Sequence, residues 1–219
     1  MTTILTAAAL VTGHEVLRPG WLEITGDTVT ALGQGPAPRP LTNSDRSFAE
    51  LTIVPGFVDM HIHGGGGSDF SHARHGTTSM AASLVSAHPE ELLRQVDVLS
   101  GHARDGLLAG IHLEGPWLAP SKKGAHDPAA LRRPDSVELD RVLSAARGTV
   151  RMVTLAPELP GAMDAIRRTV DEGAVAAVGH TDAMSSPGFC RGSFRCRSGS
   201  LGLKYFPFLM DFPRWSVIQ

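Results

Sequence analysis

From residue 53 onward, short apolar runs alternate with helix-like segments, and this alternation constrains the fold more than any other feature of the chain. The apolar runs predict five strands, at residues 53–61, 77–85, 107–114, 150–156 and 174–180. The segments between them predict three helices, at residues 89–104, 136–146 and 160–172. Strands that alternate with helices form a parallel sheet. We therefore predict an α/β fold in which, if the sheet belongs to a barrel, functional side chains lie at the carboxyl ends of the strands.

The first 52 residues follow a different pattern. Apolar runs at residues 4–12, 20–24 and 28–32 are separated by glycine-containing turns, and a stretch rich in proline and glycine follows at residues 33–40. Such runs predict strands of a small antiparallel sheet. A sheet of this size needs further strands to be stable alone.

One connection of the expected parallel sheet is irregular. Only thirteen residues, beginning with four glycines, separate His63 from Thr77. A parallel crossover needs about a dozen residues or more and usually spends most of them on a helix. Two interpretations stay open: a very short helix at residues 71–75 makes the crossing, or a helix is missing.

Four side chains of metal-binding type stand at the expected strand ends. His61 and His63 are two residues apart, so a strand directs both imidazoles to the same face. Glu114 and His180 each close another apolar run. Each alone fits a strand-end or packed residue, but together they predict one site for zinc, iron or manganese. His112 has the same strand face as Glu114, and we expect a packed neighbour more than a ligand.

Composition narrows the classes of function. The 219-residue chain has a net charge of −2 with both signs interspersed, which does not favour nucleic-acid or membrane-surface binding. No signal peptide or transmembrane span is recognisable, and we expect a cytoplasmic protein. Cys190 and Cys196 are the two cysteines and lie outside the patterned part, so neither a disulfide framework nor a cysteine zinc site is well supported.

Several motifs together resemble one enzyme family. They are Pro55-Gly-Phe-Val-Asp-Met-His-Ile-His63, His75-Gly-Thr-Thr78, His112-Leu-Glu-Gly-Pro-Trp-Leu118, Lys122-Lys-Gly-Ala-His126, Ala156-Pro-Glu158 and Val178-Gly-His-Thr-Asp182. Over about residues 1–183 the chain is similar to the N-acetylglucosamine-6-phosphate deacetylases of the amidohydrolase superfamily. The resemblance implies a metal-dependent (β/α)₈ barrel of the TIM type, a small β-sandwich, a homodimer, and an amino-sugar phosphate as substrate.

The resemblance also implies roles for individual residues. Glu114 and His180 match metal ligands, and His61 with His63 matches a pair found in members that hold a second divalent metal. Ala125 and His126 match the loop that contacts the sugar. A metal-activated water would attack the acetamide, and an aspartate late in the barrel would pass the proton to the leaving amine.

The chain departs from the family after about residue 183. The expected later metal histidine, phosphate-binding residues and catalytic aspartate are not recognisable there. No alanine follows Ala183, whereas both cysteines, the only tyrosine and five of eight phenylalanines fall in residues 189–212. We therefore expect a truncated or frameshifted sequence, with residues 1–52 as part of the sandwich, 53–183 as a partial barrel, and 184–219 as a tail foreign to the fold. Another amidohydrolase, or an inactive fragment that binds only metal or a partner chain, stays an alternative.

Overall fold

The computed structural model describes residues 1–64, 71–183 and 215–218, which form two compact units. The smaller unit contains Met1–Val58 and the described residues of 64–79 and 215–218, and the larger unit contains Asp59–His63 and residues 80–183. Both units also take part in strands β6 and β7, because the division falls within them.

The smaller unit is built on one mixed sheet, whose order is β11-β5-β1-β3-β4 with β2 paired to β1. Its strands are β1 (Thr2–Val11), β2 (Val16–Leu17), β3 (Gly20–Thr25), β4 (Thr28–Gln34), β5 (Arg46–Pro55) and β11 (Trp215–Ile218). The antiparallel pairing predicted for the first strands is confirmed for β1 with β3 and for β3 with β4, whereas β5 runs parallel to β1. Alternating apolar side chains of these strands form the core of this unit, including Leu10, Leu22 and Ile53.

Residues 184–214 and 219 lie outside the described residues, so the expectation of a foreign tail can be followed only over β11. That strand pairs antiparallel with β5 of the small sheet and not with the parallel sheet.

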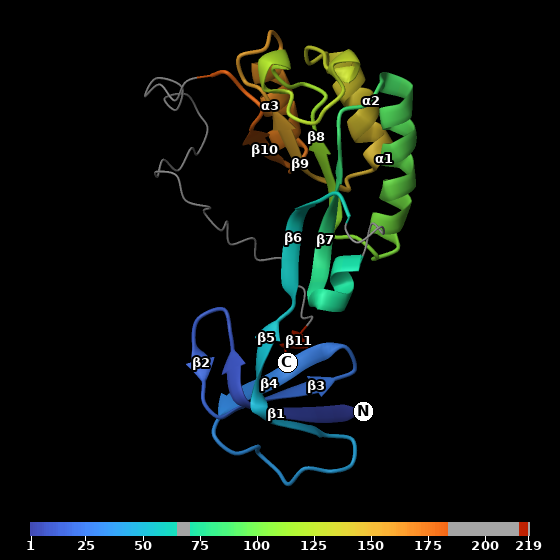
Figure 1. The fold of residues 1–219 in the computed structure, drawn as a ribbon. Helices are drawn as coiled ribbons and strands as arrows, with labels where there is room; N and C mark the ends of the chain where they lie inside the picture. The colour runs from blue at the N-terminus through green and yellow to red at the C-terminus, as the bar shows by residue number, and fades with distance from the viewer. Residues whose placement is uncertain (65–70, 184–214, 219) are drawn as a thin grey trace. The chain divides into compact units, whose positions relative to one another are not determined.

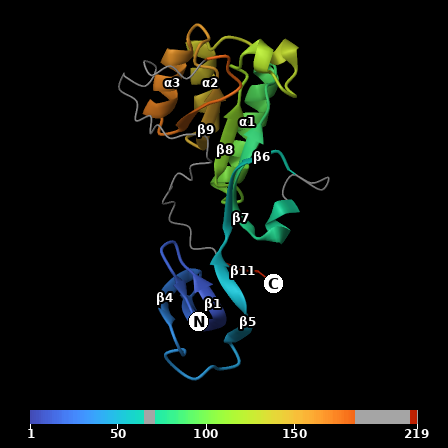
Figure 2. The ribbon, with the colours of Figure 1, turned by 60° about the vertical axis from the view of Figure 1, so that its left-hand side comes forward.

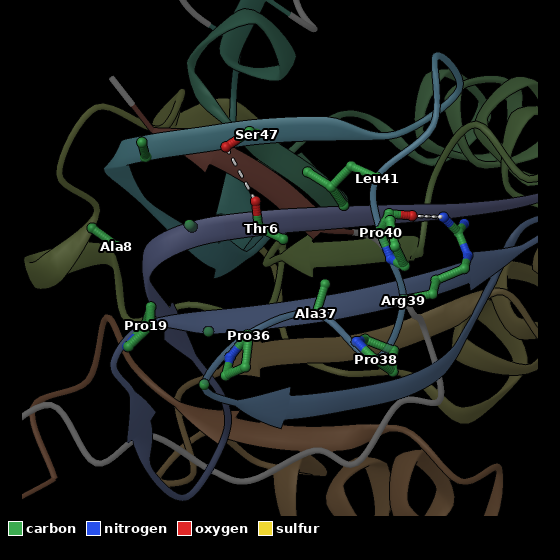
Figure 3. A pocket seen from close by; sticks show the side chains of 14 residues that line it. Thr6, Ala8, Pro19, Pro36, Ala37, Pro38, Arg39, Pro40, Leu41 and Ser47 are labelled. Atoms are coloured by element: carbon green, nitrogen blue, oxygen red, sulfur yellow. Dashed lines mark hydrogen bonds between the residues drawn. The ribbon is translucent and has the colours of Figure 1, made fainter.

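A pocket of about 660 Å³ lies on the small sheet beside the loop that follows β4 (Figure 3). Pro36, Pro38 and Pro40 line it together with Thr6, whose hydroxyl donates a hydrogen bond of 3.2 Å to Ser47. Its lining is mainly apolar, and its one charged side chain is Arg39, which forms an ion pair with Asp45. The pocket therefore offers no group suited to acid–base or metal chemistry.

The larger unit contains a five-stranded sheet in the order β10-β9-β8-β7-β6 (Figure 1). Its elements are β6 (Phe57–Ile62), β7 (Thr77–Leu84), α1 (Pro89–Arg104), β8 (Gly110–Glu114), α2 (Ser136–Ala146), β9 (Val150–Leu155), α3 (Ala162–Asp171) and β10 (Val175–Val178). The pairs β7–β8, β8–β9 and β9–β10 are parallel. Parallel strands joined through helices agree with the predicted partial (β/α) barrel.

The three helices cover one face of this sheet (Figure 2). Apolar side chains of β8 and β9, such as Ile111 and Val153, share a buried cluster with Val96 of α1, Val142 of α2 and Ile166 of α3. Because the helices cover this face, its side chains are buried. The polar side chains that could form a functional site are at the ends of the strands. In the described part of the chain, no helix is both long and apolar enough to cross a membrane.

The ends of the helices could be predicted because the residues that cap a helix lie next to its ends in the sequence. The predicted bounds of α1 and α2 are confirmed, with Pro89 opening α1 and the Asp135 carboxylate accepting a hydrogen bond from the Glu138 amide at the start of α2. Helix α3 begins two residues later than predicted, because Gly161 has a φ of 88°, which a right-handed helix cannot contain.

The strand predicted over residues 53–61 is corrected to two strands, β5 and β6, which meet at Gly56. A side chain at Gly56 would lie 1.9 Å from the Thr78 hydroxyl oxygen, so only glycine fits this approach. The irregular connection contains a 3-10 helix at Ser71–His75, which is the first of the two interpretations.

Candidate metal centre

The four predicted ligands come from three strands and meet at one end of the sheet. His61 lies in β6 and His63 follows it, whereas Glu114 is the last residue of β8. His180 lies two residues beyond β10 and has a φ of 48°, so the chain leaves the strand direction there. The predicted ligands thus lie around Glu114, in two groups that share its carboxylate.

Glu114 is the centre of the cluster. Its Oε2 lies 2.9 Å from His63 Nε2 and 3.4 Å from His61 Nε2, and its Oε1 lies 3.1 Å from His180 Nε2. The carboxylate therefore faces imidazole nitrogens on both of its oxygens. Two groups of possible ligands share it, His61 with His63 on one side, and His126 with His180 on the other.

The backbone determines which ring nitrogen of two histidines carries the proton. His63 Nδ1 lies 3.0 Å from the Ser83 carbonyl oxygen, and His180 Nδ1 lies 2.7 Å from that of Lys122. A carbonyl oxygen only accepts, so each Nδ1 donates a proton. In the neutral ring the lone pair is then on Nε2, and it points at an oxygen of Glu114. In both contacts an imidazole nitrogen that accepts faces a carboxylate oxygen that accepts. Each contact therefore needs a proton or a metal ion between the nitrogen and the oxygen.

His126 has the opposite tautomer. The backbone amide of Ser86 donates to His126 Nδ1 at 3.1 Å, which leaves the proton of the neutral ring on Nε2. The Nε2 atom lies 3.8 Å from Glu114 Oε2, which is beyond hydrogen-bonding distance. Burial lowers the pKa of His126. The neutral His126 is therefore a hydrogen-bond donor to this site and not a metal ligand through Nε2, although it lies among the possible ligands.

His112 is a packed neighbour beneath the site. It is fully buried, its two ring nitrogens lie 2.8 Å from the hydroxyls of Ser83 and Thr154, and its ring packs edge-on against His61 at 4.7 Å between centroids. Burial, with a contribution from His61, lowers the pKa of His112 to about 4. A neutral ring held on both sides packs against His61 and supports its position.

Glu114 is ionised in this setting. Burial opposes ionisation, but interaction with His61 and the hydrogen bonds that His180 and His63 donate when their rings are protonated outweigh it and hold the pKa of Glu114 below its usual value. A buried carboxylate among imidazoles, with nitrogen and oxygen donors at ligand spacing, suits a divalent transition metal.

The two residues predicted to contact the sugar differ in their exposure to solvent. Ala125 is exposed in the loop before the short helix Pro128–Ala130, whereas the neighbouring His126 is buried and turned toward Glu114. The sequence did not predict that His126 joins the metal-type cluster. Its contact with Ser86, 40 residues earlier in the chain, has no local sequence signal.

Comparison with known proteins agrees with this arrangement. No protein-family model matches the chain. The N-acetylglucosamine-6-phosphate deacetylase of Bacillus subtilis (strain 168) is 32% identical over 204 residues, which cover 81% of this chain and 50% of the relative. A solved mutant of N-acetyl-D-glucosamine-6-phosphate deacetylase from Mycobacterium smegmatis, in complex with N-acetyl-D-glucosamine-6-phosphate, aligns with 53% identity and a TM-score of 0.77 over 83% of this chain and 50% of that chain. The chain belongs to the N-acetylglucosamine-6-phosphate deacetylase family.

A second relative in this family differs in its sugar. The N-acetylgalactosamine-6-phosphate deacetylase of Escherichia coli O157:H7 is 30% identical over 228 residues, covering 94% of this chain and 59% of the relative. The chain spans about half the length of the curated relatives that it matches.

Proposed function

We propose that this chain holds the metal-binding part of a deacetylase site, which releases acetate from N-acetylglucosamine 6-phosphate to give glucosamine 6-phosphate. The observation that carries the proposal is the acceptor-to-acceptor contact on each oxygen of Glu114, at 2.9 Å to His63 and 3.1 Å to His180. The relatives named above supply the reaction and the sugar phosphate.

The residues that would hold the metal are His61, His63, Glu114 and His180. Ligands bound to one ion at about 2.1 Å are roughly 3 Å apart. The ring nitrogens of His61, His63 and His180 lie 2.9–3.4 Å from an oxygen of Glu114. Zinc, iron or manganese fits this donor set, with room for one or two ions because Glu114 can bridge. When bound, such a metal supplies a Lewis acid that lowers the pKa of a coordinated water to about 7.

His126 and Ala125 are the proposed substrate contacts. The Nε2–H of His126 is fixed by the Ser86 amide and can donate to a substrate oxygen beside Glu114. Because the ring is neutral, it binds by hydrogen bonding without adding charge to the site. Ala125 is small and exposed, so the backbone of this loop can approach a sugar.

The remaining family properties stay predictions for this chain. They are the homodimer, the cytoplasmic location, and the division at residues 52 and 183. The absence of a recognisable aspartate for general acid–base catalysis predicts turnover about 10²- to 10⁴-fold below that of a full-length relative.

Acetate release tests the proposal. We expect the purified 219-residue chain, loaded with Zn²⁺ or Fe²⁺, to release acetate slowly from N-acetylglucosamine 6-phosphate, and Glu114→Gln to abolish the release. The galactosamine isomer, assayed in parallel, decides the sugar. Equal rates for the wild type and Glu114→Gln would overturn catalysis and leave a chain that at most binds metal. A rate within tenfold of a full-length relative would overturn the predicted loss of the catalytic aspartate.

A further inference from the structure

Glu158 lies in the loop after β9 and has no role in the site described so far. The loop is anchored where the Ala156 amide donates to the Trp117 carbonyl oxygen at 2.9 Å. Two residues later, the Glu158 carboxylate accepts two hydrogen bonds from the chain that follows His180. Its Oε2 accepts from the Thr181 hydroxyl at 2.5 Å, and its Oε1 accepts from the Asp182 amide at 2.7 Å.

The segment that Glu158 holds has an unusual backbone. His180 adopts a left-handed conformation, which costs a non-glycine residue roughly 1–2 kcal/mol and persists only where its surroundings enforce it. At His180 itself, the carbonyl oxygen accepts from the Ala119 amide at 2.9 Å. On the downstream side, the Glu158 carboxylate fixes the next two residues.

The side chain of Asp182 holds the same segment through a second set of contacts. The Asp182 carboxylate accepts hydrogen bonds from the Ser121 hydroxyl and from Lys122 Nζ, the latter at 3.3 Å. The amide of Asp182 is thus held from the β9 loop, and its carboxylate from the loop that also supplies the Lys122 carbonyl oxygen to His180 Nδ1. Loss of the Glu158 contacts would leave the His180 backbone free to relax from its positive φ, and the ring would lose its alignment.

We propose that Glu158 is a positioning residue, which holds the Thr181–Asp182 backbone and thereby keeps His180 Nε2 aimed at Glu114. The inference rests on the proposed metal site, because aligned Nε2 lone pairs matter only if an ion is bound. Outer residues that orient metal ligands typically contribute 10- to 100-fold to metal affinity.

Two measurements on the full chain test this. The first is the Zn²⁺ dissociation constant, from competition with a chromophoric chelator. We expect about 10- to 100-fold weaker binding for Glu158→Ala and a smaller loss for Glu158→Gln, which retains one acceptor oxygen. Thr181→Val removes one of the two contacts and should fall between wild type and Glu158→Ala. Glu90→Gln, which removes an exposed carboxylate from α1, is the matched control and should bind like wild type.

The second measurement needs no metal. Long-range ¹H–¹⁵N spectra report which ring nitrogen is protonated, and His180→Gln identifies the His180 signal by its disappearance. At a pH where the His180 ring is neutral, we expect a single Nδ1–H tautomer in wild type and Glu90→Gln, and a tautomer mixture in Glu158→Ala and Thr181→Val. If Glu158→Ala does not fold, Thr181→Val provides the test.

An unchanged His180 tautomer in the variants overturns the positioning role, whatever the affinity. If the wild type binds no Zn²⁺, the proposed metal site fails, and the spectra still decide whether Glu158 orients His180.

Discussion

The two units each contain a buried carboxylate, and these carboxylates are satisfied in opposite ways. In the smaller unit, Asp45 accepts two hydrogen bonds from Arg39, at 2.6 and 3.0 Å, and further bonds from the Ile4 amide and from the amide and hydroxyl of Thr42. Arg39 and these donors hold the pKa of Asp45 well below its usual range. In the larger unit, Glu114 faces imidazoles whose available nitrogens, at His63 and His180, are acceptors.

The contrast separates a structural carboxylate from one that is proposed to bind a metal. The hydrogen bonds and the charge that the Asp45 carboxylate needs are all supplied by residues of the smaller unit. Glu114 lacks such donors in its contacts with His63 and His180, so a cation from outside would complete it. Burial alone does not distinguish the two residues, since both are largely hidden from solvent.

Glu114→Gln should produce the largest effect. The amide keeps the size of the side chain but removes the negative charge, so we expect Zn²⁺ affinity to fall more than about 100-fold while the fold is retained. Asp45→Asn is the matched control and should bind Zn²⁺ as the wild type does. Equilibrium dialysis with metal analysis measures both. A Glu114→Gln affinity within tenfold of wild type would contradict the assignment.

Acid should act on the two units in different pH windows. The folded pKa of His112 is about 4 and the model-peptide value is 6.5, so the unfolded chain binds the extra proton first. Stability of the metal-free larger unit should therefore fall by about 3 kcal/mol as pH drops from 6.5 to 4. The depressed pKa of Asp45 gives stability that is present above its normal pKa, near 3.8, and lost only below it.

Hydrogen exchange resolves these windows by region. Between pH 6.5 and 4, after correction for intrinsic rates, exchange should increase in β8 and β9 while β1 and β3 keep their protection. Earlier loss of protection in β1 would reverse the comparison.

Asp45→Asn should destabilise the smaller unit to a moderate degree. The neutral amide loses the ion pair with Arg39 and places an N–H group among donors, so we expect its Tm to fall by roughly 5–10 °C. Thermal unfolding followed by circular dichroism measures the change, with Asp27→Asn in the exposed β3–β4 turn as control. A Tm equal to that of the control would show that Asp45 is not a structural centre.

The smallest expected effect tests whether any carboxylate of the larger unit behaves like Glu114. Asp135 only caps α2 through the Glu138 amide, at 2.9 Å. Asp135→Ala should cost about 1 kcal/mol in the free energy of unfolding and leave Zn²⁺ affinity unchanged. Denaturant titration and the same dialysis experiment give the two values; a loss of metal binding would mean that affinity tracks general stability.

What the sequence predicted depended on how local each cause is. Helix α1 opens with Pro89 and ends before a glycine turn, so both ends were readable. The gathering of strand-end side chains around Glu114 followed from the rule for parallel sheets. In contrast, the break at Gly56 depends on Thr78, and the tautomer of His126 depends on the Ser86 amide. Such contacts join residues 22 or more positions apart along the chain, and no periodicity signals them.

The spatial order of the parallel sheet, β6 to β10, is also the order of its strands along the chain. Each new strand therefore meets a finished neighbour as the ribosome releases it. His180 follows His61 by about 120 residues, so at synthesis rates of about 5–20 residues per second it emerges roughly 6 to 24 s later. For that interval the nascent sheet carries His61 and His63 without their last partner. The proposed set of four ligands is therefore complete only after His180 has emerged.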